Sequence, residues 1–277
     1  MHIPPNSLIN EDCLNVFPYI KDDSVQLILC DLPYGTTDLE FDKFLIPFPE
    51  LWQHYNRILT KNGTIILTGS QPFTTDIINS QRNLFKYDFI WVKNRPTFFQ
   101  HAKNRPLKIH EDCIVFSKGS MMHESLNKHG NRMIYNPQGT TKIQPRTFDG
   151  KRNFGNIIGK RPSHSEKVVQ DTTDYPENVI YFDRDSDSWH PTQKPVALFS
   201  YFINTFTNEN DIVLDNCGGS FTTAIDCQNT KRKYIVIEKD KKWFDRGSYR
   251  VLQNVPAFDA IQPIVINDFL TYLMDNG

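Results

Sequence analysis

The sequence contains no apolar run that could cross a membrane, because its longest runs, such as Ile65–Leu67 and Ile235–Ile237, have the length of short strands. Its start, Met1–Pro5, lacks the basic and apolar stretch of a signal peptide, so we expect a cytoplasmic protein. Internal repeats and low-complexity segments are also absent. At 277 residues the chain can bury a core without covalent cross-links, and we therefore expect an ordered globular protein.

Cysteine is scarce and shows no metal-binding spacing. The cysteines are Cys13, Cys30, Cys113, Cys217 and Cys227. Their number is odd, no two form a Cys-x-x-Cys pair, and most lie inside apolar segments. We therefore expect reduced thiols in the core or in loops, and no metal site.

The chain also lacks an overall excess of positive charge, since its formal net charge is -1. Two stretches are nevertheless basic: residues 91–108, which contain aromatic residues and no acid, and residues 141–169, which are rich in Lys and Arg. Each could be solvated surface or could bind nucleic-acid phosphates. The candidate phosphate contacts are Lys93, Arg95, Lys103, Arg105, Lys142, Arg146, Lys151 and Arg152.

Strand-like and helix-like patterns alternate in residues 1–118, which predicts an α/β core. Strands are expected at residues 25–30, 64–68, 89–92 and 112–116, and helices at 48–59 and 74–83. Residues 119–188 are rich in Asn, Gly, Pro, His and basic residues without periodicity, which indicates an inserted module. The α/β pattern returns in residues 189–277, with helices expected at 196–206 and from 222, and strands at 212–215 and 234–238.

Two of the later strands end in acidic residues, where open parallel sheets bind ligands. Asp215 is followed by a Gly-containing loop and a helix, a pattern that lets backbone approach a nucleoside cofactor, although the Gly-Lys-Ser/Thr of a phosphate loop is missing. Glu238 follows about twenty residues later, a spacing suited to binding ribose hydroxyls. A solvated glutamate at a strand end is the alternative.

The segment Asp31-Leu32-Pro33-Tyr34 ends an earlier strand and predicts a specific chemistry. An aromatic amine is a poor nucleophile because its lone pair is delocalised into the ring. The Asp31 carboxylate and the Leu32 carbonyl could hold an NH2 group so that its lone pair points at an electrophile. Pro33 would fix the turn, and Tyr34 would offer a ring on which a base can stack.

This segment resembles the Asp-Pro-Pro-Tyr signature of amino-methylating DNA methyltransferases. The hexapeptide His190–Pro195, followed by Val213–Asp215, looks like their cofactor-binding half. Similar segments elsewhere are Trp91–Lys93, Arg105–Pro106, His110–Glu111, Tyr135–Gln138 and Ile237–Asp240. A catalytic signature before the cofactor loop is the order of the permuted β class. The resemblance implies a doubly wound, Rossmann-like α/β methyltransferase fold, with residues 1–118 and 189–277 as its halves and residues 119–188 as target recognition region.

The resemblance also implies roles by position. Asp31 and the Leu32 carbonyl would hold the target amino group, Tyr34 would stack on an extruded base, and Glu238 would bind the ribose of S-adenosylmethionine. Asp12 is the candidate for the cofactor adenine, with a helix N-cap as the alternative. The other candidate cofactor contacts are Cys13, Asp31, Thr192, Lys194, Asp215, Asn216, Gly219, Ser220 and Thr222. A structural role is an equal alternative for Thr192 and Lys194.

Three residues depart from the family pattern. Leu32 replaces a proline, which should loosen the turn, and Asn216 replaces another. Phe221 replaces a glycine, so we expect a bulky side chain where backbone should approach the cofactor.

The sequence therefore predicts a DNA methyltransferase that uses S-adenosylmethionine and modifies adenine N6 in double-stranded DNA by base flipping. A homodimer and a cognate restriction nuclease are further partners that the resemblance allows. Methylation of cytosine N4 is one alternative, and a non-catalytic DNA-binding protein that retains the fold is another.

Overall fold

Strands β2 (Val25–Cys30) and β3 (Leu59–Gly69) show why a doubly covered sheet forms. In β2, Leu27 and Leu29 face one apolar cluster, whereas Ile28 and Cys30 face another, and every residue of the strand is buried. A strand that is apolar on both faces must be covered on both faces.

The computed structural model describes residues 2–36, 39, 42–43, 45–121, 130–149, 167–254 and 262–276.

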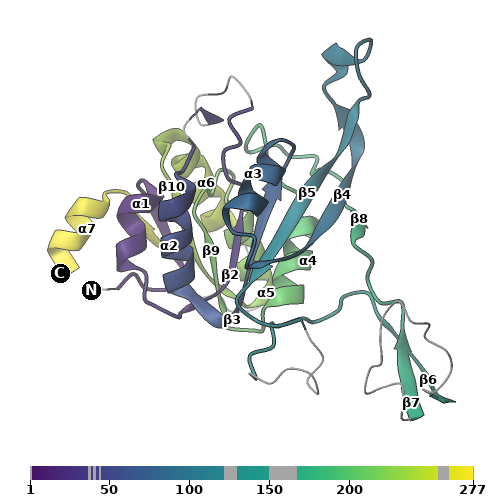
Figure 1. Cartoon of the computed structure of the whole chain (residues 1–277). Helices are drawn as coiled ribbons and strands as arrows, with labels where there is room; N and C mark the ends of the chain where they lie inside the picture. The colour runs from purple at the N-terminus through teal and green to yellow at the C-terminus, as the bar shows by residue number, and fades with distance from the viewer. Residues whose placement is uncertain are drawn as a thin grey trace.

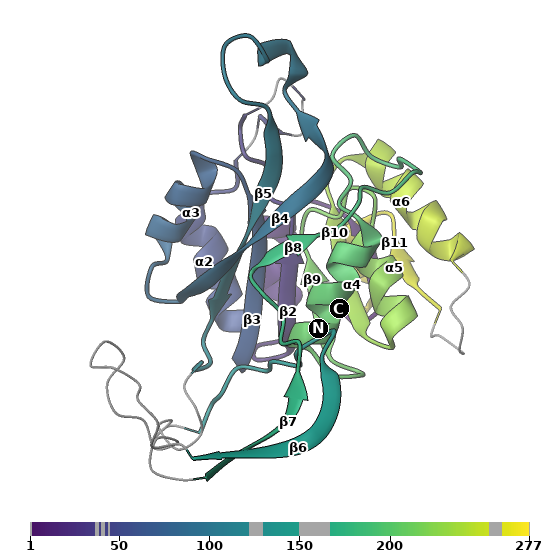
Figure 2. The same cartoon turned by 90° about the vertical axis from the view of Figure 1, so that its right-hand side faces the viewer.

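Helices form a layer on each face of this sheet (Figures 1 and 2). One layer contains α1 (Cys13–Val16), α2 (Phe48–Ile58), α3 (Phe73–Ser80) and α7 (Phe269–Asn276). The other layer contains α4 (Val196–Phe206), α5 (Thr222–Thr230) and α6 (Lys241–Gln253). The two apolar clusters therefore lie between the sheet and these two layers.

The sheet has nine strands in the order β11-β1-β10-β9-β2-β3-β5-β4-β8. The strands not yet given bounds are β1 (Ser7–Asn10), β4 (Phe85–Thr97), β5 (Lys108–Ser117), β8 (Val179–Tyr181), β9 (Ile212–Asp215), β10 (Lys233–Glu238) and β11 (Ile264–Ile266). Every strand runs in one direction except β5, which is antiparallel to both of its neighbours.

The order of the strands reverses between β2 and β9. From β2 the chain proceeds to β3 on one side, and from β9 it proceeds to β10 on the other side. The carboxyl ends of two strands that diverge in this way leave a crevice, which is where open α/β sheets bind ligands. Asp31 follows β2 directly and Asp215 ends β9, so both acids lie at this switch point.

The expected α/β fold is confirmed, with differences in detail. Strand β3 begins at Leu59 directly after α2, although we expected residues 61–63 to separate the two elements. Strand β8 lies within residues 119–188 but pairs with β4 at the edge of the main sheet. The same range contains a two-stranded hairpin, β6 (Thr141–Asp149) with β7 (Lys167–Thr173), that we did not expect. Among the described residues, no helix is long and apolar enough to span a membrane.

Strands β4 and β5 continue past the carboxyl end of β3 as a projecting hairpin. Gly69, the last residue of β3, pairs with Asp112, whereas β5 begins at Lys108 and β4 extends to Thr97. We call residues 94–109 the arm, and Figure 1 shows it standing away from the body. The arm therefore rises from the edge of the sheet that carries Asp31.

Replacing Phe202 by alanine should lower the free energy of unfolding by about 3–5 kcal/mol, because the side chain is fully buried and its ring lies 5.4 Å from that of Phe89. Urea denaturation measures this loss. The matched control is Phe99→Ala in the arm, where the phenylalanine is 77% exposed and the change should stay within about 0.5 kcal/mol. Equal losses in both variants would contradict this assignment of the core.

Candidate active site

Asp31 lies at the switch point, directly after β2, and is held by three side chains. Its Oδ1 accepts hydrogen bonds from the hydroxyl groups of Tyr34, at 2.7 Å, and Thr68. Its Oδ2 lies 2.5 Å from the Nζ of Lys194. Thr68 belongs to the neighbouring strand β3, and Lys194 precedes helix α4, so the carboxylate is positioned by both halves of the chain.

The turn after Asp31 is fixed by a residue that the sequence did not single out. The Oδ1 atom of Asp42 accepts hydrogen bonds from the backbone N–H groups of Tyr34, at 2.6 Å, and Gly35, at 3.0 Å. Leu32 is 4% exposed and packs in the core. We expected Leu32 to loosen this turn, but the Asp42 carboxylate and the burial of Leu32 hold it in place.

The ring of Tyr34 stacks on Phe73, with 4.9 Å between the ring centroids and 29° between the planes. Its hydroxyl lies 2.8 Å from Thr68 Oγ1 in addition to its bond with Asp31. Burial, together with the charge of Asp31, raises the pKa of Tyr34 well above its usual value. Tyr34 is therefore a neutral ring at the edge of the crevice, beside the carboxylate.

Lys194 is shared between two carboxylates. Besides Asp31, its Nζ lies 3.4 Å from Oε2 of Glu111 on strand β5. Burial opposes its charge, but these carboxylates outweigh burial and raise the pKa of Lys194. Burial also opposes the charge of Glu111, yet Lys194 and Lys93 lower the pKa of its carboxyl group to about 2.

Lys93 is the second cation of this network, and our expectation that it contacts DNA phosphates was wrong. Its side chain is 7% exposed and forms an ion pair with Oε1 of Glu111. Its Nζ also lies 5.2 Å from the centre of the Trp91 ring. A buried and paired ammonium is not available to a phosphate. The four charged groups Asp31, Lys194, Glu111 and Lys93 form one chain of contacts, which we call the charge network.

The loop between β9 and α5 begins after Asp215, on the other side of the switch point from Asp31. Glu238 Oε2 accepts a hydrogen bond from the backbone N–H of Gly219 at 2.8 Å, and Gly219 has the left-handed φ of +53°. Asp215 accepts hydrogen bonds from the Thr223 hydroxyl and the Cys217 N–H. Burial raises the pKa of Asp215 to about 6 and that of Glu238 to about 7.

This loop also contacts the segment that carries Lys194. The Thr222 hydroxyl donates to the carbonyl oxygen of Lys194 at 3.3 Å, and Ser220 Oγ lies 3.1 Å from Thr222 Oγ1. Thr192 contacts the ring of His190 at 3.1 Å. The expected residues Thr192, Lys194, Ser220 and Thr222 therefore lie together.

Phe221 does not crowd the loop, which corrects our expectation. It adopts the left-handed φ of 57°, and its side chain is fully buried among core residues, with its ring 5.8 Å from that of Phe244. Two glycines leave room for the ring. A Cβ atom on Gly218 would lie 2.7 Å from the Phe221 ring, and a Cβ atom on Gly247 would lie 2.6 Å from it, so a side chain at either position would clash. The ring thus points into the core beneath the loop.

Asp12 lies beside Glu238 because strands β1 and β10 pair Asn10 with Glu238. Its Oδ1 accepts from Leu14 N–H at 3.0 Å as the N-cap of α1, and its Oδ2 lies 2.8 Å from Lys239 Nζ. The capping alternative is therefore observed, and the other carboxylate oxygen forms an ion pair with Lys239.

Two further expected cofactor residues have structural contacts in the core. Cys13 is 5% exposed, and the Asn216 side chain accepts a hydrogen bond from Tyr55 at 2.5 Å and lies 3.7 Å from the Cys13 sulfur.

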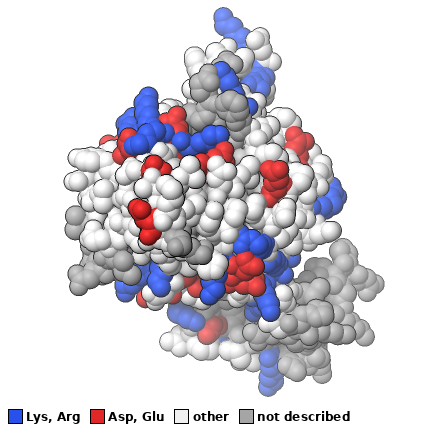
Figure 3. Space-filling model, turned by 90° about the vertical axis from the view of Figure 1, so that its left-hand side faces the viewer, with Lys and Arg blue, Asp and Glu red and all other residues white. Residues whose placement is uncertain are grey.

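The basic candidates separate into distinct places. Arg95, Lys103 and Arg105 are exposed on the arm, where Figure 3 shows Lys and Arg side chains and no acid on the projection. Lys142 and Arg146 lie on hairpin β6–β7, at the opposite end of the molecule from the arm (Figures 1 and 2). Lys151 and Arg152 fall outside the described residues.

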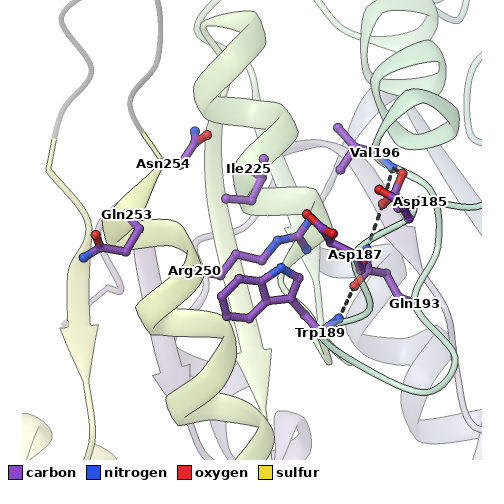
Figure 4. A pocket seen from close by; sticks show the side chains of 10 residues that line it. Asp185, Asp187, Trp189, Gln193, Val196, Ile225, Arg250, Gln253 and Asn254 are labelled. Atoms are coloured by element: carbon purple, nitrogen blue, oxygen red, sulfur yellow. Dashed lines mark hydrogen bonds between the residues drawn. The ribbon is translucent and has the colours of Figure 1, made fainter.

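A separate cleft of about 390 Å³ lies between the segment before α4 and helices α5 and α6 (Figure 4). Trp189, Gln193 and Arg250 line it, and Asp31 and Tyr34 do not. From this cleft, Arg250 donates to the Ser220 carbonyl oxygen at 2.8 Å. The arginine therefore supports the loop between β9 and α5 from behind.

A mostly parallel sheet with acids at its switch point and a glycine-bearing loop beside a strand-end glutamate suits a nucleoside cofactor such as S-adenosylmethionine. Comparison with known families assigns the chain to one of them. It belongs to the N6/N4 DNA methylase family, whose pattern, described as DNA methylase, matches residues 25–247. The protein is thus a DNA methyltransferase, and its cofactor is S-adenosylmethionine.

Curated relatives agree with this family. The chain is 26% identical to the Type II methyltransferase M.HpaI of Haemophilus parainfluenzae over 263 residues, which cover 92% of this chain and 76% of that protein. It is 27% identical to the DNA adenine methyltransferase YhdJ of Escherichia coli (strain K12), over 88% of this chain and 82% of that protein.

Solved structures show the same fold at lower identity. The crystal structure of the M1.HpyAVI–SAM complex matches with a TM-score of 0.58 at 22% identity, covering 88% of this chain and 98% of that chain. The cytosine-N4-specific PvuII DNA methyltransferase matches with a TM-score of 0.62 at 16% identity, covering 99% of this chain and 93% of that chain.

The buried carboxyl group of Glu238 predicts how stability depends on pH. Its pKa rises from 4.5 to about 7 on folding, so the folded protein binds an extra proton between these values. This contribution to stability is complete below pH 4.5 and is lost as the pH rises through about 7. Urea denaturation should therefore give a smaller fall in unfolding free energy between pH 5 and about pH 7.5 for Glu238→Gln than for the unaltered protein.

The matched control is Glu209→Gln, whose side chain is 59% exposed and which should retain the full pH dependence. A Glu238→Gln variant with the same pH dependence as the unaltered protein would show that the carboxyl group titrates normally.

Proposed function

We propose that this DNA methyltransferase modifies the N6 amino group of adenine within a specific sequence of double-stranded DNA. The observation that carries the proposal is the acceptor pair at the end of β2, the Asp31 carboxylate and the backbone carbonyl of Leu32. An aspartate at the first position of this signature is typical of the adenine-modifying members that the segment resembles. The name of the similar protein YhdJ, a DNA adenine methyltransferase, supports the same target.

The proposed chemistry is a direct transfer. Asp31 and the Leu32 carbonyl accept hydrogen bonds from the target NH2 group and so direct its lone pair, while the ring of Tyr34 stacks on the extruded base. S-adenosylmethionine supplies the electrophilic methyl group. As the N–C bond forms and the S–C bond of the sulfonium breaks, the nitrogen gains positive charge, which the neighbouring Asp31 carboxylate stabilises. S-adenosylhomocysteine leaves, and the methylated nitrogen loses one proton to solvent.

The residues on the other side of the crevice fit the cofactor. Glu238 presents a carboxylate beside Gly219, whose left-handed backbone allows close approach, and this pair suits a ribose. Asp12 lies next to Glu238 at the place proposed for the adenine. Asp215, Ser220 and Thr222 lie towards Lys194 and Asp31, where the methionine end would have to reach the target amine.

Replacing Asp31 by alanine should reduce methyl transfer by about 1000-fold or more, because the amine loses its charged acceptor. Transfer of labelled methyl groups to DNA measures this loss. Mass spectrometry of nucleosides from DNA treated with the unaltered protein should reveal N6-methyladenine. Calorimetry should show that Asp31→Ala still binds S-adenosylmethionine.

The outcomes separate the alternatives. If the product is N4-methylcytosine, the target is cytosine rather than adenine. The cytosine-N4-specific PvuII DNA methyltransferase has the same fold and so makes this alternative a specific one. Cofactor binding without any transfer by the unaltered protein would favour the non-catalytic DNA-binding protein. Substantial transfer by Asp31→Ala would remove Asp31 from the catalytic role.

We further propose that the arm contacts the DNA backbone. Arg95, Lys103 and Arg105 are exposed on it, and no acidic residue lies between Asn94 and Ile109. Because the arm rises from the catalytic edge of the sheet, these cations would meet a duplex whose base enters the crevice. Lys142 and Arg146 lie at the other end of the molecule, so they could contact DNA only at a surface separate from the arm.

Replacing Arg95, Lys103 and Arg105 together by glutamine should weaken DNA binding and reduce the slope of log affinity against log salt by about 3, because each lost phosphate contact removes about 0.9. Fluorescence anisotropy over a range of salt concentrations measures the slope. The matched control replaces Lys21, Lys61 and Arg82, exposed cations at the opposite edge of the sheet, and should leave the slope unchanged. Equal slopes for both triple variants would exclude the arm.

The Type II name of the similar protein M.HpaI supports one more proposal, that a cognate nuclease recognises the same DNA sequence. A homodimer is a separate expectation from the resemblance.

A further inference from the structure

The charge network places a cation where the target amine must bind. Asp31 Oδ1 already accepts from Tyr34 and Thr68, so Oδ2 is the oxygen left for an incoming NH2 group, and Lys194 Nζ lies 2.5 Å from it. The amine nitrogen becomes positive as it takes the methyl group. An ammonium on the same carboxylate oxygen would oppose that charge and weaken the stabilisation by Asp31.

Lys194 cannot simply lose its partner, because its side chain is 7% exposed and an unpaired buried charge is strongly destabilising. A second carboxylate is within reach. Oε2 of Glu111 lies 3.4 Å from Lys194 Nζ and, although buried, accepts no hydrogen bond. Among the buried side-chain atoms of the described residues that lack a hydrogen-bond partner, it is the one that belongs to the charge network.

Glu111 is fixed in place to receive the cation. Its other oxygen, Oε1, is bound by Lys93, which itself is buried beside Trp91. Glu111 lies on β5 next to Asp112, which accepts a hydrogen bond from Thr74 on α3 at 2.6 Å. The lysine side chain is long and flexible, so a small movement of its ammonium from Asp31 to Glu111 suffices.

We propose that Glu111 is a positioning residue whose Oε2 takes over the Lys194 ammonium when the target amino group binds to Asp31. The transfer exposes the full negative charge of Asp31 to the attacking nitrogen. In the absence of a target, Lys194 returns to Asp31 and neutralises it. The inference rests on the proposed role of Asp31 in holding the amine.

A double-mutant cycle between Glu111 and Lys194 tests the inference. Glu111→Gln should lower kcat/KM for target DNA by about tenfold or more, because Lys194 then stays on Asp31. In a Lys194→Met background no cation has to move, so adding Glu111→Gln should cost less than about twofold. The affinity for S-adenosylmethionine and for a duplex without the target should stay the same in Glu111→Gln.

Glu177→Gln, at an exposed position, is the matched control and should behave like the unaltered protein. Equal losses from Glu111→Gln in both backgrounds would overturn the inference, since a merely structural role predicts additivity. Unaltered kinetics of Glu111→Gln would overturn it too. Absence of methyl transfer by the unaltered protein would instead overturn the proposed function, and the inference with it.

A second measurement does not depend on the stability of the variants. A crystal structure of the unaltered protein with a target duplex and S-adenosylhomocysteine should place Lys194 Nζ within about 3.2 Å of Glu111 Oε2, with the target amine on Asp31. Lys194 still bound to Asp31 Oδ2 in the presence of the inserted base would overturn the inference.

Discussion

The contact between Lys194 and Asp31 connects the two halves of the chain at the place where chemistry is expected. Asp31 follows strand β2, and Lys194 lies just before helix α4, 163 residues later along the chain. Removing either partner of a buried ion pair is costly, so loss of either side chain would destabilise the site. For the geometry of the site, this contact between Lys194 and Asp31 matters more than the order in which the motifs occur along the chain.

The loop between β9 and α5 is held through its backbone. Glu238 binds the Gly219 N–H, and Arg250 on α6 binds the Ser220 carbonyl, so the loop is held from the front and from behind. Raised pKa values of Asp215 and Glu238 follow from the same burial. Contacts within the chain therefore hold the loop on both sides.

Strand ends could be predicted from the sequence because an apolar run followed by an acid is a local pattern, as at Asp31, Asp215 and Glu238. The direction in which each side chain points could not be predicted from the sequence. Along β4, Trp91 and Lys93 share one face and are both buried, which a count of basic residues cannot reveal. Asp42 and Glu111 were missed as site residues because their partners, the Tyr34 turn and Lys194, are brought to them only by the folded sheet.

Phe221 and Gly247 form a single packing unit although they belong to different elements. The ring occupies the space that a side chain at position 247 would fill. Related chains with glycine in the loop have no ring to accommodate, so they are free to carry a larger residue at the corresponding position of the last long helix. The two positions should consequently covary across the family, a signature that sequence alignments can reveal without any assay.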